Sequence, residues 1–149
     1  MQISSRFTIA VHMLTAIEIF KDYTKVTSDF LATSVRVNPV IIRKIMQSLK
    51  AAGLIEAKMG PGGMSITKPV EEITLLDIFN AVEPLGEGGL FHFHENPNEA
   101  CPVGNNIHVG LDDKLFSIQA VMEEKMKSIT LADVVRDTKV SINQQMKQN

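Results

Sequence analysis

Four side chains recur at helical spacing in the first half of the chain: Val40, Arg43, Lys44 and Gln47. They lie at i, i+3, i+4 and i+7, so a helix would carry them on one face. The face combines two cations with an amide that can both donate and accept hydrogen bonds. A DNA duplex is recognised with this chemistry, because cations bind phosphates and forked polar groups bind base edges. A solvated basic face on an ordinary surface helix has the same composition, so the pattern alone leaves both interpretations open.

The residues around this face predict where its helix begins and ends. Asn38 is a good N-cap, and Pro39 suits the first helical position, where its missing N–H costs nothing. Gly53 can adopt the left-handed conformation that ends a helix. A second set recurs at three- and four-residue spacing and is expected to face a hydrophobic core: Ile41, Ile42, Ile45, Leu49 and Ala52.

Positive charge gathers around the same helix, although the whole chain of 149 residues has a net charge of −2. Between Arg36 and Lys58 there are five cations and one anion, Glu56, which gives this segment a charge of +4 and leaves −6 for the rest. A basic patch on an acidic chain is typical of a surface that binds a polyanion. The five cations are Arg36, Arg43, Lys44, Lys50 and Lys58.

Two earlier helices are expected to position this face. The apolar spacing between Ser5 and Phe20 predicts a first helix, capped by Ser4 or Ser5. Thr27 or Ser28 can cap a brief second helix, residues 29–34, before a tight turn at 37–38. A short helix, a tight turn and a longer helix with a polar outer face form the helix-turn-helix pattern.

A predicted β-hairpin follows directly. Residues 54–58 and 64–67 are short extended runs on either side of the turn-forming sequence Met-Gly-Pro-Gly-Gly at 59–63. A hairpin after a recognition-type helix defines a winged helix, and its glycines would let backbone N–H groups approach a phosphate. The alternative is that the glycines only make a flexible turn. We predict a mainly helical (α+β) winged helix-turn-helix fold.

The rest of the chain predicts a sensor-type loop and a dimerisation helix. Thr74 begins a capping box for a helix ending at Val82. We therefore divide a single structural domain into a DNA-binding region (1–82), a loop segment (83–110) and a C-terminal region (111–149). In the last region we expect a long helix from Leu111 to Ile129, a short final helix after Thr130, and a polar tail from Ser141.

The long helix carries a near-heptad apolar stripe, which suits packing against a partner helix. The stripe could pack only on its own domain. Because the N-terminal helices and the hairpin already bury one another, we expect it to pack across the twofold axis of a homodimer. The predicted interface consists of Leu111, Leu115, Ile118, Met122, Met126 and Ile129.

The loop segment holds the reactive groups of the chain: His92, His94 and Cys101, with His108 close by. The thiol could have a lowered pKa and serve as a redox switch, or it could be a buried and inert cysteine. A third hypothesis is a transition-metal site for zinc or copper, although the ligand spacing matches no standard motif. The histidines could also be ordinary loop and packing residues.

Other classes of protein have little support in this sequence. The single cysteine allows no internal disulfide, no apolar run approaches the ~20 residues of a membrane span, and the N-terminus does not resemble a signal peptide, so we expect a cytoplasmic protein. No nucleophile triad, phosphate-loop lysine or dinucleotide fingerprint indicates an enzyme. The alternatives to a transcriptional regulator are a winged-helix protein-interaction adaptor and a small-molecule-binding or metal-binding domain without operator binding.

The chain resembles the Rrf2 family of small bacterial winged-helix transcription regulators over nearly its whole length. The resemblance rests on the helix from Ser5, on residues 38–55 with their Gly-Leu-Ile ending, on Gly-Pro-Gly-Gly at 60–63, and on Leu-Leu-Asp-Ile at 75–78. It implies a homodimeric regulator, with repression the expected effect, that binds double-stranded, partly palindromic operator DNA. It also implies that residues 38–47 enter the major groove and the hairpin tip the minor groove. The DNA-binding set we expect is Thr27, Ser28, Asn38, Pro39, Val40, Arg43, Lys44, Gln47, Lys50, Lys58, Met59, Gly60, Gly62 and Gly63.

Two departures from the family pattern matter. Family members often carry an arginine directly before Gly-Pro-Gly-Gly, but this chain has Met59, with Lys58 as the nearest cation. Lysine lacks the guanidinium fork, so minor-groove readout is expected to differ. Cluster-binding members hold a [2Fe–2S] centre with three cysteines, whereas this chain has only Cys101, with Ile107 where a thiolate six residues on would lie. We expect no iron–sulfur cluster and a signal that is an oxidant, a small molecule or a metal.

Overall fold

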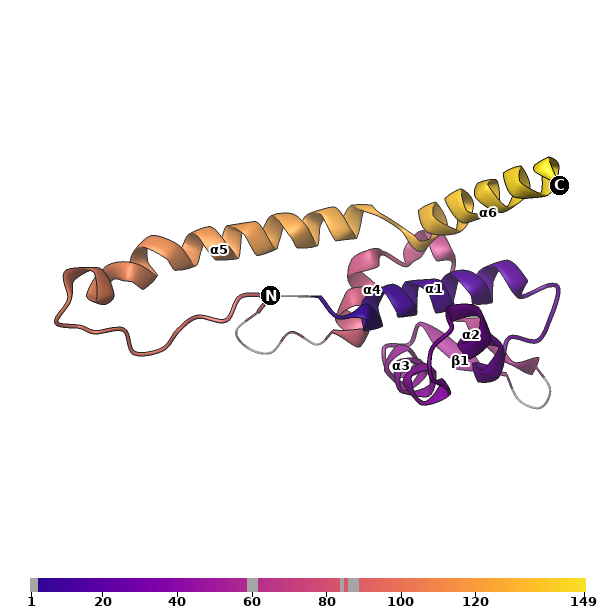
Figure 1. Ribbon diagram of the computed structural model, residues 1–149, viewed down its shortest axis with the longest axis horizontal. Helices are drawn as coiled ribbons and strands as arrows, with labels where there is room; N and C mark the ends of the chain where they lie inside the picture. The colour runs from indigo at the N-terminus through magenta and orange to yellow at the C-terminus, as the bar shows by residue number, and fades with distance from the viewer. Residues whose placement is uncertain (1–2, 59–61, 84, 86–88) are drawn as a thin grey trace.

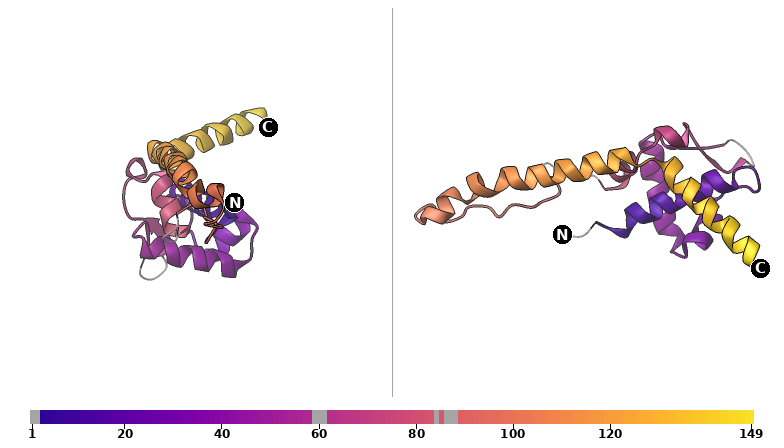
Figure 2. Two further views of the ribbon diagram at one scale, coloured as in Figure 1. Left: turned by 90° about the vertical axis from the view of Figure 1, so that its left-hand side faces the viewer. Right: turned by 90° about the horizontal axis from the view of Figure 1, so that it is seen from above.

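The computed structural model describes residues 3–58, 62–83, 85 and 89–149, and it has an elongated shape (Figure 1). A compact body holds the first four helices and the β-hairpin. A long helix projects from the body with the preceding segment alongside it, and we call residues 89–128 the arm. The final helix crosses over the body at an angle to the arm, as the view from above shows (Figure 2).

Local sequence signals set the first three helices. Helix α1 (Ser5–Phe20) begins after Ser4, whose side chain accepts from the backbone N–H of Arg6. Helix α2 (Ser28–Val35) is capped by Thr27, which accepts from the N–H of Phe30 at 3.2 Å. Helix α3 (Pro39–Ala51) follows, and Gly53 ends it with a φ of +74°. The predicted bounds of the first helix, the two caps and the stop signal are confirmed.

A two-stranded antiparallel sheet follows α3. Strand β1 (Ile55–Ala57) pairs with β2 (Met64–Ile66), with Ile55 opposite Ile66. Both strands lie within the predicted extended runs, so the winged helix-turn-helix fold is confirmed, and residues 59–61 of the predicted turn lie outside the described part of the chain. A short 3-10 turn, η2 (Val70–Glu72), leads to helix α4 (Leu75–Val82), which begins with the predicted capping box.

One hydrophobic core holds the body together. Phe79 of α4 lies edge-on to Phe7 of α1, with ring centres 5.6 Å apart. Two expected core positions on α3 are wrong: Ile41 and Ala52 are exposed. Ile41 lies in the first turn of α3 and Ala52 is its C-cap, so both are at the ends of the helix, where the core leaves them uncovered. The buried side chains at the centre of the core include Met13, Leu14, Ile17, Leu31, Ile42, Ile45, Leu49, Ile73, Ile78 and Leu131.

Helix α5 (Pro102–Ser128) is longer than predicted, because it begins nine residues before Leu111. Its first residues include Gly104 and Gly110, which usually favour loops but are helical here. Pro102 at the first helical turn supplies the start signal that the sequence analysis took as part of a loop. No described residue of α5 is fully buried.

Helix α6 (Leu131–Gln148) was expected to be short and followed by a frayed tail, and that expectation is wrong. No proline or glycine interrupts the sequence after Thr130, so the helix continues almost to the end of the chain. Leu131 and Val135 are buried in the core of the body and hold the start of α6 against it. In the described part of the chain, no helix is long and apolar enough to cross a membrane.

Hydrogen bonds fix the junction between α5 and α6 to the start of α4. The N–H of Leu75 donates to the carbonyl of Ile129 at 2.9 Å, and the N–H of Leu131 donates to that of Ile73 at 2.7 Å. Thr130 caps α6 through a second capping box with Asp133. These bonds set the direction in which α5 leaves the body.

Candidate nucleic-acid interface

Helix α3 presents its polar face to solvent. Arg43, Lys44 and Gln47 are all exposed on the side opposite the core, as the spacing predicted. Asn38 and Val40 lie exposed at the N-terminal end of the same helix. The Asn38 Oδ1 atom accepts from the N–H of Val40 at 2.8 Å, so its amide NH2 group is left to donate to a ligand. The partial positive charge of a helix N-terminus adds to the attraction of this end for phosphate.

The cations around α3 are not neutralised within the described chain. None of the described carboxylates lies within ion-pair distance of the five cations between residues 36 and 58. All five side chains belong to exposed residues. Lys50 is in the last turn of α3, and Lys58 follows β1. Exposed cations of this kind can bind phosphates, and Lys58 lines a surface pocket that also contains Glu18, Asp22 and Glu71.

The turn between α2 and α3 contains Arg36, which the sequence predicted only as one of the five cations of the basic patch. Arg36 is the C-cap of α2 and adopts a left-handed conformation with φ +59°. Its N–H donates to the carbonyl of Ala32 at 2.9 Å. A non-glycine residue with positive φ is uncommon, and here it places an exposed guanidinium group next to the N-terminus of α3. Thr27 and Ser28, at the start of α2, are half-buried.

The base of the wing is closely attached to the helix-turn-helix. The N–H of Lys58 donates to the carbonyl of Gly63 at 2.8 Å, and the N–H of Met64 donates to that of Val26 at 3.0 Å. Gly63 has φ +70°, and a Cβ atom there would lie 2.7 Å from the Val26 oxygen. Glycine is therefore required at this position on both grounds. Gly62 is exposed, while Met59 and Gly60 lie outside the described residues.

The segment before α5 packs along that helix. The N–H of Leu90 donates to the Gln119 side chain at 2.8 Å. The ring of Phe93 lies 5.5 Å from that of Phe116 and 6.2 Å from that of His108, measured between ring centres. A cavity of about 570 Å³ on this side is lined by Phe91, His92, Phe93, His94, Glu95, Asn96, His108 and Asp112.

The structure brings the three predicted histidines together but leaves the cysteine apart from them. His92, His94 and His108 line one cavity, and Cys101 is not among its lining residues. The imidazole of His108 is 3.0 Å from a carboxylate oxygen of Asp112, which the sequence analysis did not single out. The four-residue spacing between His108 and Asp112 on a helix was the signal available.

Cys101 is exposed and is the N-cap of α5. The backbone N–H groups of Gly104 and Val103 lower the pKa of its thiol. Of the two alternatives, the buried cysteine is wrong, and a redox role for the exposed thiol stays a prediction. An iron–sulfur centre does not fit these residues, because such clusters need several thiolates and the chain has one. The half-buried side chain of Ile107 stands where a further thiolate would be needed.

The predicted dimer residues are divided between two environments. Leu111, Leu115, Met122, Met126 and Ile129 are half-buried, whereas Ile118 is exposed. The side of α5 that includes Ile118 also exposes Val103 and Val121, and an apolar groove at its N-terminal end includes Ile107 and Gly110. The open hydrophobic face is therefore shifted around the helix relative to the predicted stripe.

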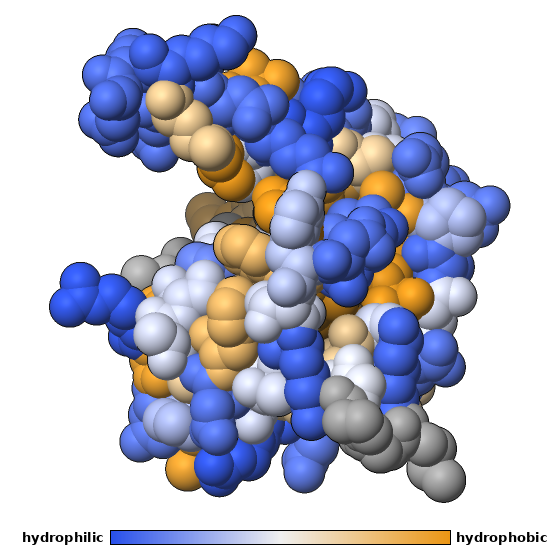
Figure 3. Space-filling view, turned by 90° about the vertical axis from the view of Figure 1, so that its right-hand side faces the viewer, coloured by the Kyte–Doolittle hydropathy of each residue, from blue (hydrophilic) through white to orange (hydrophobic). Residues whose placement is uncertain are grey.

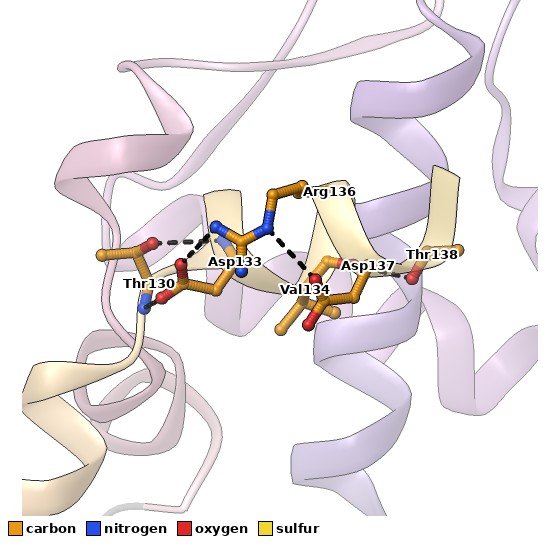
Figure 4. A network of polar contacts seen from close by, with 6 residues as sticks. All are labelled: Thr130, Asp133, Val134, Arg136, Asp137 and Thr138. Atoms are coloured by element: carbon orange, nitrogen blue, oxygen red, sulfur yellow. Dashed lines mark hydrogen bonds and ion pairs between the residues drawn. The ribbon is translucent and has the colours of Figure 1, made fainter. Parts of the chain in front are cut away.

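A polar network stabilises the start of α6, directly after the arm ends (Figure 4). The N–H of Thr130 donates to Asp133 at 2.9 Å, and Arg136 donates to both Asp133 and Asp137 at 3.0 and 3.1 Å. The backbone N–H and then the hydroxyl of Thr130 hold the pKa of the Asp133 carboxyl below its ordinary value, with a smaller contribution from Arg136. The two carboxylates raise the pKa of the Arg136 guanidinium.

Beside this network, an apolar cleft of about 400 Å³ separates α6 from α1 and α2. Figure 3 shows hydrophobic residues gathered in the hollow beneath α6. Val11, Ile19 and Phe20 of α1 face Val134 and Ile142 of α6 across it. No residue of α3 lines the cleft among those that the structure describes, so the cleft is separate from the exposed polar face of that helix.

Comparisons with known proteins agree with this geometry. Residues 3–137 match the model of the Rrf2 family, described as an iron-dependent transcriptional regulator. The chain is 38% identical over 133 residues to a protein of Bacillus subtilis (strain 168) named "Putative HTH-type transcriptional regulator YwnA", and the match covers 89% of this chain and 96% of that one.

Solved structures show the same fold. A crystal structure described as that of "a putative DNA binding protein" has a TM-score of 0.68 and 32% identity, and the match covers 87% of this chain and 98% of the other. The structure of CymR (YrzC), the global cysteine regulator of B. subtilis, has a TM-score of 0.67, covering 91% of this chain and 97% of that one. At 18% identity, the similarity to CymR shows the fold alone.

Proposed function

Because the chain belongs to the Rrf2 family and is a DNA-binding transcriptional regulator, we propose that it works as a homodimer that represses transcription from a partly palindromic operator. The observation that carries the proposal is the exposed face of α3, where Arg43, Lys44 and Gln47 stand beside the wing without an intramolecular ion pair among the described groups. We infer repression because a protein bound to promoter DNA would compete with the polymerase for the same duplex.

We assign two roles in DNA binding to the residues on and beside α3. Gln47 and Arg43 have forked polar groups that suit base edges in the major groove. Lys44, Lys50 and Arg36 are placed around the helix as phosphate contacts, which orient the protein without selecting a sequence. The free amide of Asn38 extends this set at the N-terminus of α3. Because Met59 replaces the expected arginine, the wing contributes backbone contacts and Lys58 rather than guanidinium readout of the minor groove.

We assign the dimer interface to the open hydrophobic face of α5. Val103, Ile118 and Val121 recur at helical spacing and are 67%, 55% and 69% exposed. Gly110 lies between them and would allow close approach of a second backbone. A 27-residue helix is about 40 Å long. Two such arms, packed along each other, would bury a hydrophobic surface that a single chain leaves in water.

For the inducing signal, we favour oxidation of Cys101. The thiol is exposed and its pKa is lowered by the backbone N–H groups of Gly104 and Val103, so more of it is thiolate at neutral pH. Attack of the thiolate on a peroxide breaks the O–O bond, giving a sulfenic acid on Cys101 and releasing hydroxide. A second thiol, from the other protomer or a small molecule, then forms a disulfide with loss of water.

The experiment is fluorescence anisotropy of the purified chain on its own promoter DNA and on random DNA of equal length. Binding that is tighter on the promoter and weakens steeply with salt supports the operator proposal, because phosphate contacts release counterions. Equal, weak binding to both sequences would favour the protein-interaction adaptor. The same titration with peroxide, repeated on Cys101→Ser, tests the signal. Loss of binding in both proteins, or in neither, contradicts the thiol switch.

A further inference from the structure

We propose that His94 and His108 form a binding site for a divalent transition-metal ion of the zinc class, oriented by Asp112. The site lies in the arm, on the opposite side from the open hydrophobic face. Metal binding at this site requires neither DNA binding nor Cys101. An iron–sulfur cluster would need several thiolates, whereas these residues offer imidazole and carboxylate ligands, which suit zinc.

The two imidazoles already stand at a separation that suits a shared ion. The ring centres of His94 and His108 are 5.2 Å apart. Two imidazole nitrogens bound to one tetrahedral zinc at about 2.0–2.1 Å keep their ring centres roughly 5 Å apart. Stacking of two imidazoles without a metal would not fix the direction of their ring nitrogens. In His108, that direction is set by a further contact.

Asp112 gives His108 the orientation of a metal ligand. Its carboxylate lies 3.0 Å from Nδ1 of His108, and both side chains are about one-third exposed. When the carboxylate accepts a hydrogen bond from Nδ1, the neutral imidazole presents Nε2 as its free lone pair. A carboxylate on the far nitrogen is the usual outer partner of a metal-binding histidine. Phe93 lies edge-on to the His108 ring and provides the apolar support that such sites use.

The remaining ligands come from the loop side of the cavity or from water. Among the residues that the structure describes, no three such side chains are already gathered around one point, so the site without metal is only half assembled. His92 and Glu95 line the same cavity and are exposed, on a segment without regular structure. We expect one of these two side chains to supply a third ligand when the ion binds. Binding would then join residues 92–95 to α5.

Cobalt(II) titration of the full chain, prepared without a histidine tag, tests the proposal. Cobalt takes zinc's tetrahedral site and acquires visible absorption when bound. We expect one ion per chain, displaced by Zn²⁺. Replacing either imidazole, in His94→Gln or His108→Gln, should weaken binding at least ~10-fold, and Asp112→Asn should weaken it ~10–100-fold, the range for outer-shell partners.

Two control variants distinguish cobalt held at this site from cobalt held elsewhere on the chain. His12→Gln removes an exposed imidazole of α1, which contacts Ser34 at 2.9 Å, and it should bind cobalt like the unmodified chain. Cys101→Ser should also leave binding unchanged, and no sulfur-to-cobalt charge-transfer band should appear. Unchanged affinity in both His94→Gln and His108→Gln, or loss of binding in Cys101→Ser, would overturn the proposal. His94 is exposed, so its variant is expected to fold even if His108→Gln does not.

Discussion

The body and the arm of this protein bury hydrophobic residues to very different extents. In the body, α1, α3, α4 and the first turns of α6 enclose a core of fully buried side chains. In the arm, no described residue of α5 is fully buried, and large apolar side chains face water. A segment that buries so little cannot compensate for the entropy of ordering its chain. The body therefore has a core of its own, whereas the arm is expected to gain its stability from a second copy.

The largest difference in stability between body and arm is expected for a matched pair of phenylalanines. Phe79 in the body is 1% exposed, and Phe116 in the arm is 52% exposed. We expect Phe79→Ala to lower the free energy of unfolding by about 3–5 kcal/mol, because it leaves a cavity. Phe116→Ala should cost at most about 1 kcal/mol, as is usual at the surface. Urea unfolding followed by circular dichroism measures both, and similar losses would mean that the arm has a core of its own.

The next largest effect is expected from charges on the open face of the arm. Ile118→Glu combined with Val121→Glu should weaken dimerisation by about 2–4 kcal/mol, because two apolar contacts would be replaced by carboxylates that lose their water. Sedimentation velocity across a range of concentrations measures the change. The control is Val109→Glu: Val109 is 82% exposed but lies nine residues from Ile118, which is half a turn around the helix. Dimers that survive the double variant would place the interface elsewhere.

Individual side chains of the body should contribute measurably to DNA affinity. We expect Arg43→Ala to cost about 1–3 kcal/mol on the specific operator if Arg43 contacts a base, and less on random DNA. Lys139→Ala, on α6, removes a cation from an exposed position away from α3 and should change neither affinity. An equal loss on both DNAs would instead make Arg43 a phosphate contact. Anisotropy titrations on both DNAs distinguish these outcomes.

The smallest effect is expected at the junction of the two regions. The pKa of Asp133 is lowered in the folded chain, chiefly by the backbone N–H of Thr130, so the carboxylate form is favoured by folding. Its contribution to stability is present above the unfolded pKa and is lost as the pH falls through the lower, folded pKa. Asp133→Asn should therefore reduce the loss of stability on acidification. The control is Asp113→Asn, which removes an exposed carboxylate in the arm. The urea midpoints of unfolding, measured from neutral to acidic pH, give the pH dependence of stability for each protein. Parallel profiles for Asp133→Asn and the unmodified chain would contradict the assignment.

Much of the body was predictable because its signals are local. Ser4, Thr27, Asn38 and Thr74 each cap a helix through a bond to a residue two or three positions away. Gly53 and the glycines of the hairpin mark turns in the same local way. The order of these elements was sufficient for the winged helix-turn-helix fold and for the exposed face of α3. The local signals at Pro102 and Gly104 were ambiguous, and the start of α5 was accordingly placed too late.

What the sequence determined by itself is which residues share a face of a helix, because the 3.6-residue period follows from backbone geometry alone. Only the tertiary structure decided what each face meets. Leu115 and Ile118 belong to one apolar stripe in the sequence, but the packing of α5 beside α4 and residues 89–98 leaves Ile118 in the open and half-covers Leu115. In the same way, His94 and His108 meet because α5 returns along the extended segment that precedes it (Figure 1). Contacts between segments far apart in sequence depend on how whole elements pack, and no local pattern specifies that.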